Sequence, residues 1–138
     1  MKTLYQTRAS ATGGRNGHVV SADGVLDLKL AIPREMGGPG GALSNPEQLF
    51  AAGYAACFDS ALAFVAAQHK LKLAGTRVDA TVGIGQNGAG GFGLAVKLDV
   101  TIPDLPREEA EALLAQTHTV CPYSNALRGN VDVELVLN

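Results

Sequence analysis

A long, Ala-rich apolar segment constrains the fold of this chain more than any other feature. Residues 46–69 are predicted to form one helix, with Pro46 at its first position and Ser44 and Asn45 as candidate caps. Ser44 and Glu47 also have the spacing of a capping box. The segment is apolar nearly all round, so it should be buried on most sides. Because a chain of 138 residues can barely enclose such a helix alone, the sequence predicts a partner subunit that covers part of it.

Strand patterns surround this helix on both sides. Residues 25–32 alternate apolar and polar side chains, and Asp23-Gly24 before them is a strong two-residue hairpin signal. A second helix is indicated by Asp104-Leu105-Pro106 and is predicted to run through Glu108 to about His118, with acidic residues in its first turn. This order predicts an α+β fold of one domain, residues 1–138, with antiparallel sheets, a long buried central helix and a second helix. The strands are expected at residues 4–9, 18–21, 25–32, 77–84, 92–102 and 131–137.

Composition and charge exclude several classes of function. A net charge of -2 without any basic run is not that of a nucleic-acid-binding protein. Residues 49–67 are long enough to cross a bilayer, but Asp59 lies mid-segment and most residues are Ala, Gly and Ser. A buried soluble helix is therefore favoured, and no membrane contact is expected. The first residues lack the apolar core of a signal peptide, so we expect a cytoplasmic protein.

The two cysteines are the candidates for chemistry. Composition alone favours two buried free thiols, because a reducing cytoplasm disfavours a permanent disulfide. The three histidines lack metal-ligand spacing and the chain has no CxxC, so neither a metal site nor a cofactor is predicted. No local signature supports a Cys–His hydrolase.

Cys57 lies in the middle of the predicted central helix. Phe50, Tyr54 and Phe64 share its helical face. The side chain is therefore either a core thiol packed on aromatic rings or a nucleophile in an apolar pocket. Apolar burial raises the pKa of a thiol and makes it inert, so a reactive Cys57 requires a nearby cation. The N-terminus of the helix is about three turns away, too distant to supply that charge.

Arg15 is the cation that we favour, with Glu47 as the carboxylate that holds it. Glycines around Arg15 let the backbone approach closely, although a turn Arg that points into water is the simpler alternative. Glu47 and Cys57 are ten residues apart, which separates them by about 15 Å along a straight helix and about 80° around it. Because they cannot meet directly within one helix, we expect the Arg–Glu unit that serves Cys57 to come from the other subunit.

Several separated motifs, in the same order, closely resemble the organic hydroperoxide resistance (Ohr) branch of the Ohr/OsmC family. The chain's length and element order also fit that branch along nearly its whole length. Asn16 stands where many relatives have Asp. The matching segments are ATGGRNG at 11–17, NPEQLFAAGY at 45–54, ACF at 56–58, GFGL at 91–94 and VCPYSN at 120–125.

The resemblance implies an obligate, intertwined homodimer with two active sites at the interface. It implies that Cys57 attacks the peroxide, that Cys121 resolves the product as a disulfide, and that Arg15 and Glu47 are the activating pair. The implied substrate is an organic hydroperoxide, and the implied reductant is a dihydrolipoyl group on a lipoylated protein, without a bound metal or flavin. We expect an apolar substrate pocket, with Phe50, Tyr54, Phe64 and Phe92 as its binding residues.

Apart from a plain dimeric scaffold, which would leave the two cysteines unexplained, two alternatives stay open beside this interpretation. One is a sister OsmC-type peroxidase with a broader or different peroxide preference, although the stretch CPYSN at 121–125 favours Ohr. The other is a non-catalytic dimer that senses redox state or binds a ligand in the same apolar pocket.

Overall fold

The computed structural model describes all 138 residues, which divide into two compact units, Met1–Leu49 and Phe50–Asn138. Each unit contains one three-stranded sheet. The predicted α+β class is confirmed, and the prediction of a single domain stays a prediction.

The first unit carries the sheet formed by β1 (Ala9–Thr12), β2 (His18–Ser21) and β3 (Asp27–Lys29), which pair antiparallel in that order. Its hairpin is confirmed at the predicted Asp23-Gly24, where Gly24 takes a φ of 75° and its N–H donates to the carbonyl of Ser21. Two short 3-10 turns complete the unit, η1 (Gly14–Asn16) and η2 (Arg34–Met36).

Two strand predictions in this unit need correction. Residues 4–8 are exposed and belong to no strand, because pairing with β2 begins only at Ala9. The strand predicted at 25–32 is confined to Asp27–Lys29, and the next residue, Leu30, forms an isolated bridge with Ser44. Local alternation predicted a longer strand at 25–32, but pairing with a neighbouring strand decides how much of a segment joins the sheet.

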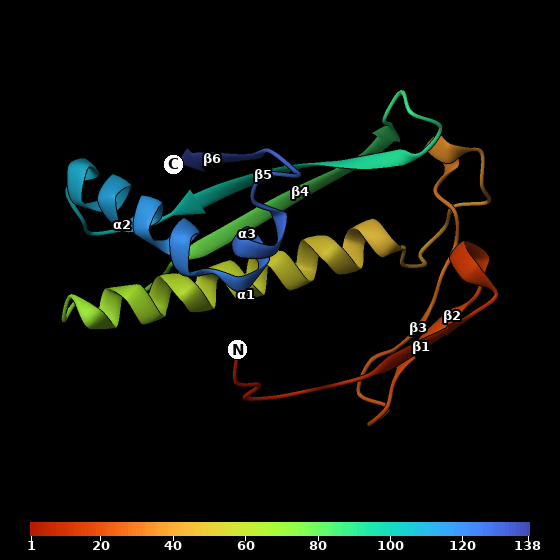
Figure 1. Ribbon diagram of the computed structural model, residues 1–138, viewed down its shortest axis with the longest axis horizontal. Coiled ribbons are helices and arrows are strands. Elements are labelled where there is room, and N and C mark those ends of the chain that lie inside the picture. The colour runs from red at the N-terminus through yellow and green to blue at the C-terminus, as the bar shows by residue number, and fades with distance from the viewer. The chain divides into compact units, whose positions relative to one another are not determined.

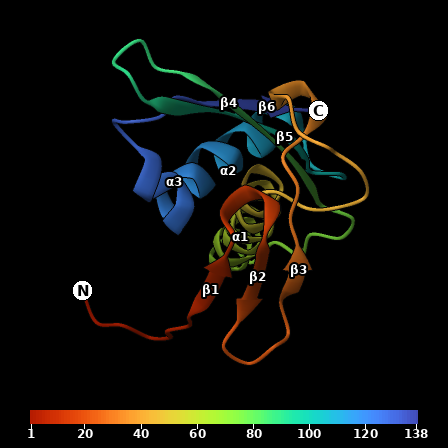
Figure 2. The same cartoon turned by 90° about the vertical axis from the view of Figure 1, so that its right-hand side faces the viewer.

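The predicted central helix is confirmed as α1 (Pro46–Gln68). The second unit contains β4 (Arg77–Gln86), β5 (Phe92–Thr101), α2 (Arg107–Val120), α3 (Pro122–Leu127) and β6 (Val133–Leu137). The sheet order is β4-β5-β6, and β6 runs parallel to β5, so this sheet is mixed. Figures 1 and 2 show α1, α2 and α3 on the same face of the sheet.

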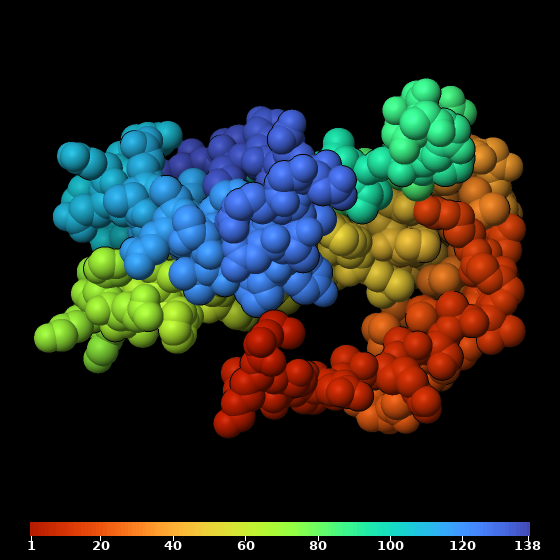
Figure 3. All heavy atoms as spheres, in the orientation of Figure 1, coloured from red at the N-terminus to blue at the C-terminus, as the bar shows by residue number.

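The core of the second unit lies between this sheet face and the helices. Alternate residues of β5 are buried because successive strand side chains point to opposite faces. They pack against one side of α1 and against α2, and Figure 3 shows atoms of α2 and α3 directly beside those of α1. The fully buried large apolar side chains of this core are Tyr54, Phe58, Leu62, Val65, Leu98 and Val100.

One side of α1 is buried and the other is exposed. By length and composition alone the helix could cross a membrane, but it supplies six residues to the core, as the central helix of a soluble protein does. Only 33% of its apolar window is buried within this chain. On the other side Phe64 is 56% exposed, next to exposed small residues. The helix was predicted to be buried on most sides, but within a single chain only one side of it is buried.

Candidate active site

The two cysteines, 64 residues apart in the sequence, lie together in the second unit. The thiol of Cys121 donates to the sulfur of Cys57 across 3.7 Å, and both thiols are free. Cys57 is partly exposed, whereas Cys121 is completely buried. A disulfide has an S–S length of about 2.0 Å, so a small movement of either side chain would join them.

Cys121 owes its position to the junction between α2 and α3. Pro122 follows it, and because a residue before proline avoids helical angles, Cys121 takes a ψ of 123° and ends α2. Pro122 then begins α3, where its missing N–H costs nothing. This six-residue helix was not predicted from the sequence, although Pro122 at its first position was a usable signal.

The surroundings of Cys57 act on its pKa in two directions. Burial raises the pKa of the thiol above its ordinary value, as predicted for an apolar site. The backbone N–H of Tyr123 acts in the opposite direction, because it donates a hydrogen bond to this sulfur and favours the thiolate. Tyr123 therefore belongs to the site, which the sequence analysis did not foresee.

Arg15 and Glu47 form a bidentate ion pair in the first unit. The guanidinium donates from Nη1 to Oε2 at 2.8 Å and from Nη2 to Oε1 at 2.6 Å. The two side chains are 30% and 15% exposed. The hydrogen bond from Arg15 lowers the pKa of Glu47 and holds this carboxylate in its charged form. The alternative of a turn Arg that points freely into water does not hold in this chain.

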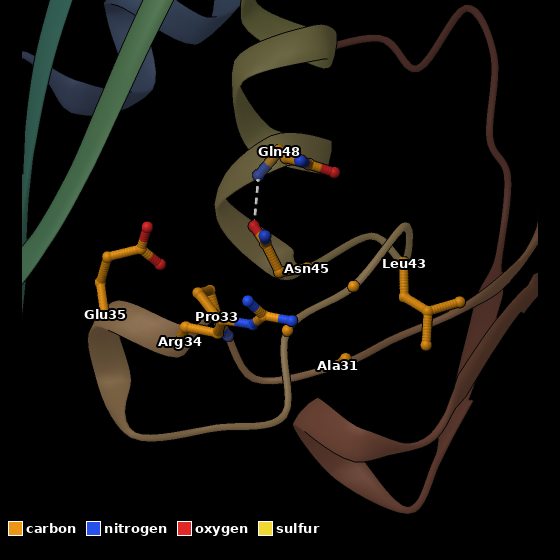
Figure 4. A pocket seen from close by; sticks show the side chains of 9 residues that line it. Ala31, Pro33, Arg34, Glu35, Leu43, Asn45 and Gln48 are labelled. Atoms are coloured by element: carbon orange, nitrogen blue, oxygen red, sulfur yellow. Dashed lines mark hydrogen bonds between the residues drawn. The ribbon is translucent and has the colours of Figure 1, made fainter.

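Because Glu47 binds Arg15, the predicted capping box with Ser44 is wrong. Asn45 caps the helix instead, and its Oδ1 accepts the backbone N–H of Gln48 at 2.8 Å (Figure 4). These two residues also border a surface cleft of about 300 Å³. None of the predicted site residues lines this cleft.

The loop that carries Arg15 is shaped by glycines. Gly13 takes a φ of 76°, in the left-handed region. A Cβ on Gly17 would lie 1.8 Å from the carbonyl oxygen of Thr12, so no other residue fits there without moving the backbone. Asn16 accepts the N–H of Ile32 at 3.0 Å, which ties the loop to the rest of the first unit.

Aromatic rings gather around the turn of α1 that precedes Cys57. The ring of Tyr123 lies 6.0 Å from that of Phe50 and 5.7 Å from that of Tyr54, between centroids. Gly53 makes room for it, because a Cβ there would meet the phenol oxygen of Tyr123 at 2.9 Å. Tyr123 is 39% exposed, so this cluster, with the neighbouring Cys57, reaches the surface.

The comparisons identify the family. A family model described as OsmC-like protein matches residues 38–136. The chain belongs to the OsmC-like family. It is 57% identical over 137 residues to the organic hydroperoxide resistance protein of Xanthomonas axonopodis pv. citri, covering 99% of this chain and 96% of that one.

Solved structures of the organic hydroperoxide resistance branch agree with this assignment. A putative organic hydroperoxide resistance protein from Vibrio cholerae, with captopril bound in one of its active sites, has a TM-score of 0.96 at 54% identity. The alignment covers 100% of this chain and 94% of that one. OhrB of Bacillus subtilis has a TM-score of 0.89 at 43% identity, with 99% and 100% covered.

In this member of the OsmC-like family, six of the eight predicted site residues fall into three groups. Cys57 and Cys121 form one pair, and Arg15 and Glu47 form another. Phe50 and Tyr54 belong to the aromatic cluster. Phe64 and Phe92, at 56% and 68% exposure, lie outside that cluster, so their role in substrate binding stays a prediction. No group of three or more His, Cys, Asp or Glu side chains is close enough to hold a metal ion.

Proposed function

We propose that this chain is a thiol peroxidase that reduces organic hydroperoxides, with Cys57 as the attacking and Cys121 as the resolving cysteine. The observation that carries the proposal is the sulfur–sulfur distance of 3.7 Å combined with unequal exposure. A peroxide must reach the sulfur that it oxidises, and of the two cysteines only Cys57 is partly exposed. A resolving thiol needs no access to solvent, and it must lie near its partner, as the buried Cys121 does.

The proposed reaction has one oxidation by the peroxide, one condensation that forms the disulfide, and one reduction. The Cys57 thiolate attacks the outer oxygen of R–O–O–H, the O–O bond breaks, and the alcohol leaves with a proton, so that Cys57 becomes a sulfenic acid. Cys121 then attacks this sulfur, a disulfide forms and water leaves. A dithiol reduces the disulfide to two thiols and is itself oxidised to a disulfide.

Arg15 and Glu47 supply the charge that Cys57 requires. The guanidinium would stabilise the thiolate and the negative charge that develops on the leaving oxygen. Glu47 fixes its orientation through two hydrogen bonds, and without it a half-buried Arg would lack its counter-ion. The prediction that this pair serves Cys57 of the partner subunit is part of the proposal.

A homodimer is part of the proposal because both units have surfaces that one chain does not cover. β1 is exposed along its whole length, and a three-stranded sheet without a covered face has little stability in water. The exposed side of α1 carries Phe64 among small residues, which is suited to close packing against a second copy. Burial of a Phe side chain contributes about 1.5–3 kcal/mol.

The resemblance to Ohr suggests a lipoylated protein as the reductant and a peroxide with an apolar group as the substrate. The aromatic cluster of Phe50, Tyr54 and Tyr123 beside Cys57 supports the preference for an apolar group. A sister peroxidase of broader preference would reduce hydrogen peroxide as fast as cumene hydroperoxide. A redox-sensing dimer would form the disulfide but would not turn over with dihydrolipoamide.

Titration of free thiols tests the proposal directly. One equivalent of cumene hydroperoxide should remove both thiols of the wild-type protein and produce an intramolecular disulfide. Under the same conditions Cys121→Ser should stop at a sulfenic acid, which a dimedone adduct would reveal by mass spectrometry. If both wild-type thiols survive the peroxide, the proposal fails.

A further inference from the structure

A buried hydrogen-bond chain joins the three helices around Cys121. The hydroxyl of Ser124, in α3, lies 2.8 Å from the phenol oxygen of Tyr54 in α1 and 2.9 Å from Nδ1 of His118 in α2. Ser124 and Tyr54 are completely buried, and His118 is partly exposed. Ser124 is thus the one side chain that ties the segment after Cys121 to both neighbouring helices through its hydroxyl.

Donor and acceptor in these two hydrogen bonds can be assigned, because each buried O–H proton needs an acceptor. The Tyr54 phenol stays protonated because burial raises its pKa, and its proton needs an acceptor. If Tyr54 donates to Ser124, the hydroxyl proton of Ser124 is free to go to Nδ1 of His118. Every buried proton then has an acceptor. The opposite direction would leave the phenol proton without one. His118 is therefore neutral, with its proton on Nε2.

We infer that Ser124, held between Tyr54 and His118, is a positioning residue that keeps the thiol of Cys121 within reach of Cys57 for disulfide formation. This inference rests on the proposed function, in which Cys121 is the resolving cysteine. Cys121 is three residues before Ser124, and the N–H of Asn125 donates to its carbonyl at 2.9 Å, so a shift of Ser124 moves Cys121.

The geometry explains why such positioning affects the second step most. Disulfide formation needs the Cys121 sulfur in line with the sulfenic acid, and reacting atoms that are held near contact distance gain much of their rate from that placement. The present 3.7 Å is close to such an arrangement. Attack on the peroxide does not use the Cys121 thiol, and Cys57 itself lies in α1. The backbone N–H of Tyr123, next to Ser124, also favours the Cys57 thiolate, so a shift of Ser124 slows the attack to some extent. Disulfide formation slows more, because it also requires the placement of Cys121.

Single-turnover kinetics of Ser124→Ala test the inference. Reduced protein is mixed with one equivalent of cumene hydroperoxide, peroxide consumption is followed, and quenched samples are analysed by intact mass for sulfenic acid and disulfide. We expect disulfide formation to slow at least about tenfold more than peroxide consumption, so that sulfenic acid accumulates. Equal slowing of both steps, or of neither, would overturn the inference, whereas a wild-type protein that forms no disulfide would overturn the proposed function instead.

Two further variants keep the test valid if Ser124→Ala folds poorly. Tyr54→Phe keeps the aromatic ring of the cluster and removes one end of the hydrogen-bond chain, so it should slow disulfide formation more than peroxide consumption. His118→Asn keeps an acceptor at the position of Nδ1 and should retain more of the rate of this step than His118→Ala. If the two His118 variants are equally slow, or if Tyr54→Phe matches the wild type, Ser124 is not positioned in this way.

A matched control and a spectroscopic measurement separate positioning from stability. Thr117→Val removes another completely buried hydroxyl, which donates only to the carbonyl of Leu113 in its own helix. It should lower the thermal stability without changing the ratio of the two rates. Ring ¹⁵N NMR of His118 at neutral pH should show Nδ1 unprotonated and Nε2 protonated. A protonated Nδ1 would contradict the chain of hydrogen bonds on which the inference depends.

Discussion

The replacement Glu47→Gln should slow the attack of Cys57 on peroxide by about tenfold to a hundredfold. Gln keeps the size of Glu and one acceptor, but it loses the charge that receives hydrogen bonds of 2.6 and 2.8 Å from Arg15. A hydrogen bond to a charged group contributes about 1.5–3 kcal/mol. Because Arg15 is 30% exposed, solvent screening keeps the total loss near that of one such bond. Since about 1.4 kcal/mol corresponds to a tenfold change, a loss of about 1.5–3 kcal/mol slows the attack about tenfold to a hundredfold.

Stopped-flow measurement of peroxide consumption by the reduced protein gives this rate without the resolving step. Glu47 lies in the first turn of α1, so its loss also removes a favourable interaction with the helix dipole. Glu108→Gln removes the corresponding charge from the first turn of α2 and is the matched control, with no expected effect on the rate. If Glu47→Gln reacts as fast as Glu108→Gln, the carboxylate does not hold an activating Arg15.

Three other outcomes are expected. Phe64→Glu should weaken dimerisation by about tenfold or more, because it places a charge on the exposed apolar side of α1, and sedimentation velocity would detect the monomer. Burial and the charge of Arg128 lower the pKa of His118 below 6.5, so the stability that the neutral ring provides is complete above about pH 6.5 and is lost as the pH falls through the folded-state pKa. Thermal melts of the wild type should show this loss, and melts of His118→Asn should not. Hybrid dimers mixed from Cys57→Ser and Glu47→Ala should regain one intact site and exceed both parents in activity if the Arg–Glu pair acts on the partner subunit.

Elements defined by local signals could be predicted from the sequence. The central helix was predicted to within one residue, because Pro46 marks its start and apolar residues continue to its end. The hairpin at Asp23-Gly24 was equally local. The parallel pairing of β6 with β5 depends on the path of the chain after α3, and no local sequence pattern predicts that path. The helix α3 was missed because six residues are too few to show a helical period.

The candidate site was predictable in its residues and less so in its contacts. Spacing marked Ser44 as a capping-box partner of Glu47, whereas the need of Cys57 for a cation indicated Arg15, 32 residues from Glu47. The fold shows that Asn45 caps the helix, which leaves Glu47 free for Arg15. Tyr123 contributes a backbone N–H, and since every residue except proline has one, its role could not be found from residue type.

The backbone N–H of Tyr123 changes what the site requires from Arg15. Burial alone would make Cys57 inert, and the N–H offsets part of that effect before any cation is considered. The same short segment brings the Cys121 thiol and the Ser124 hydroxyl to the site, so in the proposed reaction it acts on both the thiolate and the sulfenic acid.

In the proposed reaction, Arg15 is needed mainly while Cys57 is charged, because a neutral sulfenic acid gains little from a cation. The Arg15–Glu47 pair and the Ser124 chain therefore act mainly on different steps. They share no hydrogen-bond partner, so their effects on free energy should be independent. In the double variant Glu47→Gln with Ser124→Ala, peroxide consumption should then slow as in the first variant and disulfide formation as in the second. If disulfide formation is slower in the double variant than in Ser124→Ala alone, the Arg15–Glu47 ion pair also positions Cys121.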